Sequence, residues 1–427
     1  MIYHTGKEFA EELDAKDPLR SFRDRFLIPY TPDGKEYIYF CGNSLGLQPR
    51  SARAAIEQEL EDWGRFGVEG HLRAKNPWLP YHEFLTSSTA RLVGAEVDEV
   101  VVMNSLTVNL HLMMVSFYRP KASRHKIVIE SNAFPSDQYA VQSQLAFHGY
   151  DPAEALIELQ PHDGETWIRT EDIEVLLSSE GQSVALVLLG GVNYLSGQAF
   201  DMERITRAGH ANGCIVGFDL AHAAGNLQLS LHDWDVDFAV WCSYKYLNAG
   251  PGAVGGCFIH QRHGNSKSLP RFAGWWGHNK NTRFLMGSQF DSSPGAEGWQ
   301  LSNAPILSMA ALRASMEIFD EVGITALSSK GNLLTGYLEY LIDQIPGRSV
   351  TILTPRDKSQ RGAQLSLRVT GDGKKIFTSL TGCGVMCDWR EPNVIRVAPA
   401  PLYNTFLEVY TVAEHLQSIL DSLPGPR

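Results

Sequence analysis

Residues 215–225 read Ile-Val-Gly-Phe-Asp-Leu-Ala-His-Ala-Ala-Gly, an apolar run that ends on an acidic residue. The short apolar run predicts a buried strand with Asp219 at its carboxyl end. Open α/β sheets bind ligands outside the carboxyl ends of their strands, and a buried carboxylate is costly unless a cation pairs with it. Asp219 also suits the cap of a helix that follows the strand. This stretch alone does not decide between a ligand-binding residue and a helix cap.

A second apolar run, Phe238 to Cys242, is followed by Ser-Tyr-Lys-Tyr-Leu-Asn and then by a glycine-rich loop. Lys245 therefore follows a buried strand directly, and buried lysines become nucleophiles that form Schiff bases. Asp219 lies 26 residues earlier, at the end of another predicted strand. The pair matches pyridoxal phosphate enzymes of the aspartate aminotransferase fold. In that fold the lysine binds the cofactor covalently and the aspartate pairs with the pyridinium nitrogen.

Two segments that open helices after strands predict further parts of a cofactor site. The first, Asn-Ser-Leu-Thr at 104–107, offers free N–H groups and the hydroxyl of Thr107 to a phosphate. The second, Phe-Pro-Ser-Asp at 134–137, offers Phe134 to stack on a pyridine ring and Asp137 as a second carboxylate near it. An ordinary capped helix explains each segment equally well on local grounds.

Short apolar runs alternate with helical patterns over residues 51–304, where one helix is predicted over 77–93. This alternation predicts an α/β fold, with a large cofactor-binding domain whose mostly parallel sheet is covered by helices on both faces. Residues 305–427 start with two long helical patterns and continue with strands, which predicts a smaller α+β C-terminal domain. Residues 1–50 are predicted to form an arm that packs with this smaller domain.

The composition argues against a nucleic-acid-binding, membrane or metal-binding protein. The chain has 427 residues, of which 44% are hydrophobic and 20% charged, as in folded globular proteins. Acidic residues outnumber basic ones by 48 to 37 without a basic stripe, so nucleic acid is not an expected partner. No apolar run is long enough to span a membrane and the N-terminus is polar, so we expect no membrane contact and a cytoplasmic location. The six cysteines suggest free thiols, and Cys383 and Cys387 lack metal-site spacing, so no metal is expected.

The chain resembles the kynureninase family from end to end. The similarity rests on six stretches, namely 41–49 (Cys-Gly-Asn-Ser-Leu-Gly-Leu-Gln-Pro), 104–110 (Asn-Ser-Leu-Thr-Val-Asn-Leu), 134–137 (Phe-Pro-Ser-Asp), 218–223 (Phe-Asp-Leu-Ala-His-Ala), 242–248 (Cys-Ser-Tyr-Lys-Tyr-Leu-Asn) and 396–399 (Arg-Val-Ala-Pro). The runs at 134–137 and 243–248 separate the chain from the cysteine desulfurases, which are structural relatives of the family.

The resemblance implies a fold-type-I pyridoxal phosphate enzyme, a homodimer with active sites at the subunit boundary. Lys245, Tyr244 and Asp219 would be catalytic. One subunit would contact the cofactor through Leu106, Thr107, Phe134, Pro135, Ser136, Asp137, Asp219, His222, Tyr244 and Lys245, and the other subunit through Trp275 and Asn303. Arg396 would bind the substrate α-carboxylate, which suits a bidentate guanidinium. Ser44, His71 and Asn303 would face the substrate ring, although His71 also reads as an ordinary loop residue.

The implied activity is hydrolysis of the Cβ–Cγ bond of kynurenine or 3-hydroxykynurenine, in tryptophan degradation and the supply of NAD precursors. The polar set at Ser44, His71 and Asn303 favours the 3-hydroxy substrate. Family members often have a hydroxyl residue where this chain has Gly190, so a side-chain contact is missing there. A cysteine desulfurase, an aminotransferase and a binding protein that retains the fold are the alternatives. The non-catalytic binding protein is disfavoured because the chain keeps the residues expected to be functional, Lys245, Asp219 and Arg396.

Overall fold

A seven-stranded sheet forms the centre of the molecule in the computed structural model, which describes residues 2–266, 268–347 and 349–422. The strand order is β4-β10-β9-β8-β7-β5-β6. β10 runs antiparallel to both of its neighbours, whereas β9, β8, β7, β5 and β6 are mutually parallel. The strands are β4 (Val100–Val102), β5 (Lys126–Glu130), β6 (Leu156–Leu159), β7 (Val184–Gly190), β8 (Ile215–Asp219), β9 (Phe238–Trp241) and β10 (Gly256–Ile259). The predicted mostly parallel sheet is confirmed.

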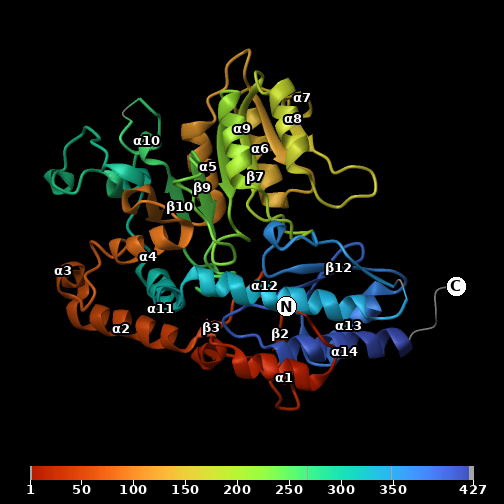
Figure 1. The fold of residues 1–427 in the computed structure, drawn as a ribbon. Helices are drawn as coiled ribbons and strands as arrows, with labels where there is room; N and C mark the ends of the chain where they lie inside the picture. Colours follow the sequence, from red (N-terminus) through yellow and green to blue (C-terminus); the bar gives the residue numbers. More distant parts are fainter. Residues whose placement is uncertain (1, 267, 348, 423–427) are drawn as a thin grey trace.

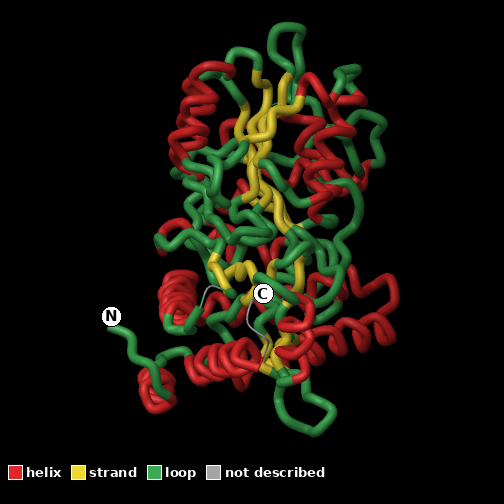
Figure 2. The backbone as a smooth tube through the Cα atoms, turned by 90° about the vertical axis from the view of Figure 1, so that its right-hand side faces the viewer, coloured by secondary structure: helices red, strands yellow, loops and turns green. Residues whose placement is uncertain are grey.

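Helices cover both faces of this sheet, which Figure 2 shows edge-on between them. On one face, α5 (Leu106–Phe117) and α6 (Pro135–Phe147) contribute buried side chains such as Met113 and Val141 to one core. On the other face, α4 (Glu83–Val93), α8 (Thr170–Glu180) and α9 (Met202–Ala211) contribute to a second core. Burial on both faces explains why the strands read as nearly continuous apolar runs.

A second sheet of four antiparallel strands carries its own core near the C-terminus (Figure 1). Its order is β11-β12-β15-β14. The strands are β11 (Val350–Ile352), β12 (Leu365–Val369), β14 (Asp388–Arg390) and β15 (Val394–Val397), and the helices beside them are α12 (Ile324–Asp343), α13 (Gly373–Gly382) and α14 (Phe406–Ser422). The N-terminal segment adds α1 (Lys7–Lys16), which packs against α14, and β2 (Ile38–Tyr39), which pairs with β13 (Val385–Met386). The arm was predicted to begin at residue 1 and the smaller domain to end at residue 427, and residues 1 and 423–427 lie outside the described residues.

The packing of one helix crosses the predicted domain boundary at 304/305. α11 (Ile306–Val322) packs against α2 (Arg50–Phe66) and α4, and Met309 and Phe319 belong to the core of the large sheet. The remaining short elements are β1 (Phe26–Leu27), β3 (Gln48–Pro49), α3 (Gly70–Arg73), α7 (Pro152–Ala155) and α10 (Gln261–Gly264).

The helix predicted over 77–93 begins only at Glu83, so that boundary was wrong. Residues 79–82 form turns instead. Pro80 explains the difference, because proline disfavours the helical conformation in the residue before it. Among the described residues, no helix combines the length and the apolar character needed to cross a membrane.

Candidate active site

A pocket of about 140 Å³ lies at the carboxyl ends of the central parallel strands. β8 ends at Asp219, and Lys245 follows the end of β9. The pocket brings together nine of the predicted cofactor residues, namely Leu106, Thr107, Phe134, Ser136, Asp137, Asp219, His222, Tyr244 and Lys245. It is the position at which open α/β sheets bind their ligands.

The amine of Lys245 contacts a histidine inside this pocket. Lys245 Nζ lies 2.9 Å from Nε2 of His222, and 5.8 Å from the centre of the Phe134 ring. Burial, with the nearby Lys245 charge, lowers the pKa of His222 well below its usual value. His222 is therefore a neutral acceptor for the Lys245 amine, and its buried Nδ1 has no partner in the described structure.

Two buried carboxyl groups face the same pocket. Burial raises the pKa of Asp137 well above its usual value, with the neighbouring Asp219 charge as the next cause. Burial also raises the pKa of Asp219. Asp219 Oδ1 accepts the Ala221 N–H at 2.7 Å, but residues 221–226 form turns rather than a helix, so the predicted helix cap was wrong and the bond closes a turn. Asp137 Oδ1 is buried and has no partner among the described residues.

The N-terminal ends of α5 and α6 meet at two hydroxyl groups. Thr107 Oγ1 and Ser136 Oγ are 2.8 Å apart, one in the first turn of each helix. Ser105 precedes α5 without a side-chain capping bond, so the first N–H groups of that helix are not capped by a side chain. N–H groups at a helix start bind anions such as phosphate. Pyridoxal phosphate fits this pocket, which offers an anion cradle, an unpartnered buried acid and a lysine amine.

The loop at 41–49 supports the lysine segment from outside the pocket. The Gly46 N–H donates to the Tyr244 carbonyl at 2.8 Å. A Cβ atom on Gly46 would lie 2.3 Å from the Lys245 carbonyl oxygen and 2.2 Å from Asn248 Oδ1. Only glycine permits this close approach, so the 41–49 loop packs directly against the lysine segment.

Arg396 is buried and already has partners in the single chain. Its Nε donates to Asp388 Oδ1 at 2.6 Å, and a second bond joins Nη2 to Asp388 Oδ2. Nη1 donates to the Tyr194 carbonyl at 2.8 Å, and Ser44 Oγ donates to Asp388 at 2.7 Å. The guanidinium does not line the pocket itself. A substrate carboxylate at Arg396 would share the guanidinium with Asp388.

Other predicted site residues do not line the pocket of this chain. Trp275 is 42% exposed and donates its indole N–H to the Arg283 carbonyl. Asn303 is exposed in a separate hollow beside the loop that opens α5. His71 lies on α3, where its Nδ1 contacts the Val68 carbonyl at 2.9 Å. Pro135 starts α6 and serves as its first residue.

The sequence interpretation missed Glu130, the last residue of β5, which also lines the pocket. Burial raises the pKa of Glu130 to about 7. Gly190, Val192, Tyr194 and Ala221 complete the lining. A carboxylate that ends a buried strand was the available signal, the same signal that marked Asp219.

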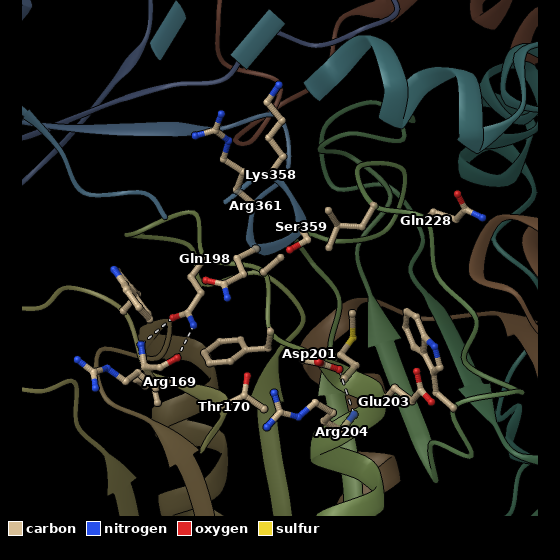
Figure 3. A pocket seen from close by; sticks show the side chains of 18 of the residues that line it. Arg169, Thr170, Gln198, Asp201, Glu203, Arg204, Gln228, Lys358, Ser359 and Arg361 are labelled. Carbon is tan, nitrogen blue, oxygen red and sulfur yellow. Dashed lines mark hydrogen bonds between the residues drawn. The ribbon is translucent and has the colours of Figure 1, made fainter. Parts of the chain in front are cut away.

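A larger pocket of about 400 Å³ lies where the starts of α8 and α9 face residues 358–361 (Figure 3). Each of its three arginines, Arg169, Arg204 and Arg361, forms an ion pair with a glutamate. Gln198 is fixed by two hydrogen bonds to the backbone of Ile168. The guanidinium groups of this pocket are thus paired with carboxylates, whereas the smaller pocket holds the buried Asp137 Oδ1 and His222 Nδ1 without partners among the described residues.

Comparisons with known proteins identify the family and the fold. Residues 327–416 match the family described as the kynureninase C-terminal domain. The chain is 60% identical to a kynureninase of Koribacter versatilis over 98% of its length and 99% of that protein, and 61% identical to one of Myxococcus xanthus over 97% and 98%. Among solved structures, the cysteine desulfurase CsdA of Escherichia coli matches with a TM-score of 0.77 at 17% identity, covering 95% of this chain and 99% of that one. The apo cysteine desulfurase of Thermococcus onnurineus NA1 matches with a TM-score of 0.74 at 16% identity, covering 99% and 100%.

Fold and pocket together define the class, a pyridoxal phosphate-dependent enzyme of fold type I. Cysteine desulfurases share the fold at low identity only, which argues against that alternative. Within the class, the chain belongs to the kynureninase family.

Proposed function

We propose that this chain hydrolyses the Cβ–Cγ bond of kynurenine or 3-hydroxykynurenine, releasing alanine and anthranilate or 3-hydroxyanthranilate. The observation that carries the proposal is the pocket in which the Lys245 amine, neutral His222 and the Asp137 and Asp219 carboxyl groups meet. Its membership of the kynureninase family supplies the reaction type.

Different residues would hold different parts of pyridoxal phosphate. Thr107, Ser136 and the first N–H groups of α5 suit the phosphate. Phe134 would stack on the face of the pyridine ring, and Asp219 would pair with the ring nitrogen. Lys245 would form the covalent bond to the cofactor. When bound, the cofactor supplies an electron sink for the negative charge that develops on the amino acid.

The chain's own residues would then move protons. Once the substrate amine has displaced it, Lys245 is a free amine that removes the α-proton, with His222 beside its Nζ to orient it. Asp219 keeps a proton on the ring nitrogen. Tyr244 lines the same pocket, and burial raises its pKa, so it remains a neutral phenol that can relay a proton. Water adds to the γ-carbonyl of the substrate before the Cβ–Cγ bond breaks.

Substrate binding would use Arg396 for the α-carboxylate. Asp388 holds the guanidinium in a buried, oriented position, and Ser44 contacts both side chains. Such preorientation lowers the entropic cost of binding a carboxylate. The apolar neighbours of Arg396 strengthen its electrostatic attraction for the substrate.

The active enzyme would be a homodimer. Trp275, Asn303 and His71 lie outside the pocket of their own chain, and we infer that they serve the pocket of the other subunit. Trp275 is 42% exposed, as expected of a residue available for a neighbouring subunit. His71 and Asn303 would then bind the 3-hydroxyl group of the preferred substrate. We also propose a cytoplasmic role in tryptophan degradation and the supply of NAD precursors.

One assay tests the proposed reaction. The protein is incubated with pyridoxal phosphate and kynurenine, and fluorescent anthranilate and alanine are quantified. We expect the two products in equal amounts. A keto acid in place of alanine would indicate an aminotransferase, and sulfide from cysteine a desulfurase. Absence of all these products from a cofactor-loaded protein would contradict a catalytic role.

A further inference from the structure

Glu130 and Gly190 form a contact at the floor of the pocket. Glu130 ends β5 and is 4% exposed, and its carboxylate oxygens lie 3.1 and 3.2 Å from the Gly190 nitrogen, whose N–H they accept. Gly190 ends β7, which lies between β5 and β8 in the sheet. On its other side Gly190 pairs in register with Asp219. The contact therefore joins the strand that carries Glu130 to the strand that carries Asp219.

The missing side chain of Gly190 makes room for the carboxylate. A Cβ atom built on Gly190 would lie 2.9 Å from Glu130 Oε1, closer than such contacts allow. Any larger residue at 190 would push the Glu130 carboxyl group away from the β7 backbone. The space left by the glycine is thus used by an acidic group that enters from β5.

Glu130 adds a third carboxyl group to a pocket with one cationic side chain. The other titratable groups that line this pocket are Asp137, Asp219, His222, Lys245, Tyr194 and Tyr244. Several carboxylates this close cannot all ionise against a single lysine. Burial raises the pKa of Glu130 to about 7, with the Asp219 charge as a further cause. The Glu130 charge is in turn among the causes that raise the pKa of Asp137.

We propose that Glu130, seated in the space left by Gly190, is a positioning residue that sets how strongly Asp137, Asp219 and the cofactor ring nitrogen hold their protons. The inference rests on the proposed pyridoxal phosphate site. An ionised Glu130 raises the pKa of the neighbouring acidic groups and of the ring nitrogen. A protonated Glu130 carries no charge and does not raise them. The residue touches the β7 backbone and acts on the ring nitrogen through the two aspartates.

Two measurements on the cofactor-loaded protein test this role. The first is a pH titration of the visible absorption band of the bound cofactor in wild type, Glu130→Gln and Gly190→Ala. Glutamine keeps an oxygen for the Gly190 N–H but carries no charge. We expect the midpoint in Glu130→Gln to move to lower pH by about one unit, because a neighbouring negative charge is lost. Glu69→Gln, at an exposed helical position, should leave the midpoint unchanged.

Gly190→Ala should shift the midpoint in the same direction, because the new Cβ displaces the Glu130 carboxylate. In the Glu130→Gln background, Gly190→Ala should add no further shift, since contacting residues act non-additively. The second measurement is infrared spectroscopy of the wild type, which needs no variant to fold. A carboxylic acid band that disappears as pH rises through about 7 and is absent from Glu130→Gln would support the proposal.

A wild-type midpoint in Glu130→Gln, or an infrared spectrum without such a band, would overturn the role of Glu130. Either result would leave the visible band of the bound cofactor in place, and the proposed function with it. Failure of the wild type to bind the cofactor at all would instead remove the proposed site.

Discussion

The Lys245 amine and the His222 imidazole lie 2.9 Å apart, and the histidine is buried with a lowered pKa. A neutral imidazole can accept a hydrogen bond from an amine without repelling its charge. His222 therefore orients Lys245 toward the pocket while leaving the amine free to react. This arrangement matches a lysine that must bind a cofactor, release it and then move a proton.

Replacing Asp219 by asparagine should slow the reaction with little change in the local fold. The asparagine oxygen can still accept the Ala221 N–H, so this turn bond survives while the charge is lost. Without that charge the ring nitrogen loses its proton more readily. We expect kcat to fall on the order of a thousandfold, at about 1.4 kcal/mol per decade of rate. Asp219→Glu serves as the milder control, and an asparagine variant with wild-type kcat would rule the role out.

Asp137→Asn should change how stability depends on pH. The folded-state pKa of Asp137 is raised, so above the ordinary aspartate pKa the folded protein holds a proton that the unfolded chain has lost. The free energy of unfolding of the cofactor-free protein should therefore fall as pH rises above the ordinary aspartate pKa. Asparagine removes this titration, so the variant should gain stability at pH 8 relative to wild type.

Urea unfolding at several pH values measures this difference. Asp137→Asn should also bind the cofactor less tightly, because a pocket carboxyl group is lost. Parallel pH dependences in the wild type and the variant would show that Asp137 does not titrate in this way.

The strand ends that carry Lys245 and Asp219 could be predicted because buried parallel strands read as apolar runs. Glu130 ends a buried strand as Asp219 does, but its contact with Gly190 could not be predicted, because Gly190 lies on a neighbouring strand that only the sheet order identifies. The Asp388 partner of Arg396 depends in the same way on the pairing of β14 with β15. Local patterns predict where a strand ends, but strand order decides which side chains meet.

Mixed dimers should show whether two chains build one site. Lys245→Ala and Trp275→Ala proteins, each inactive or weakened alone, are mixed and allowed to exchange subunits. If Trp275 serves the pocket of the other subunit, one mixed site contains both intact residues and about a quarter of the wild-type activity returns. Exchange is checked by mass spectrometry of tagged chains, and no recovery despite proven exchange would place Trp275 elsewhere.

The substrate preference should favour 3-hydroxykynurenine. Buried polar groups left without a partner by plain kynurenine cost about 1–3 kcal/mol, so kcat/KM should differ by roughly 5- to 150-fold. His71→Phe and Asn303→Thr should each reduce the difference. The kcat/KM values of both substrates are compared in all three proteins. Equal or reversed values in the wild type would refute the preference.

The assignment of Lys245 as the residue that binds the cofactor is the central claim, and mass spectrometry tests it most directly. The wild type is treated with borohydride in the presence of pyridoxal phosphate, digested, and searched for the modified peptide. We predict a reduced pyridoxyl group on Lys245 and on no other lysine of the chain, and its loss together with the visible band and turnover in Lys245→Ala. A pyridoxyl group on another residue, or near wild-type turnover by Lys245→Ala, would contradict the assignment.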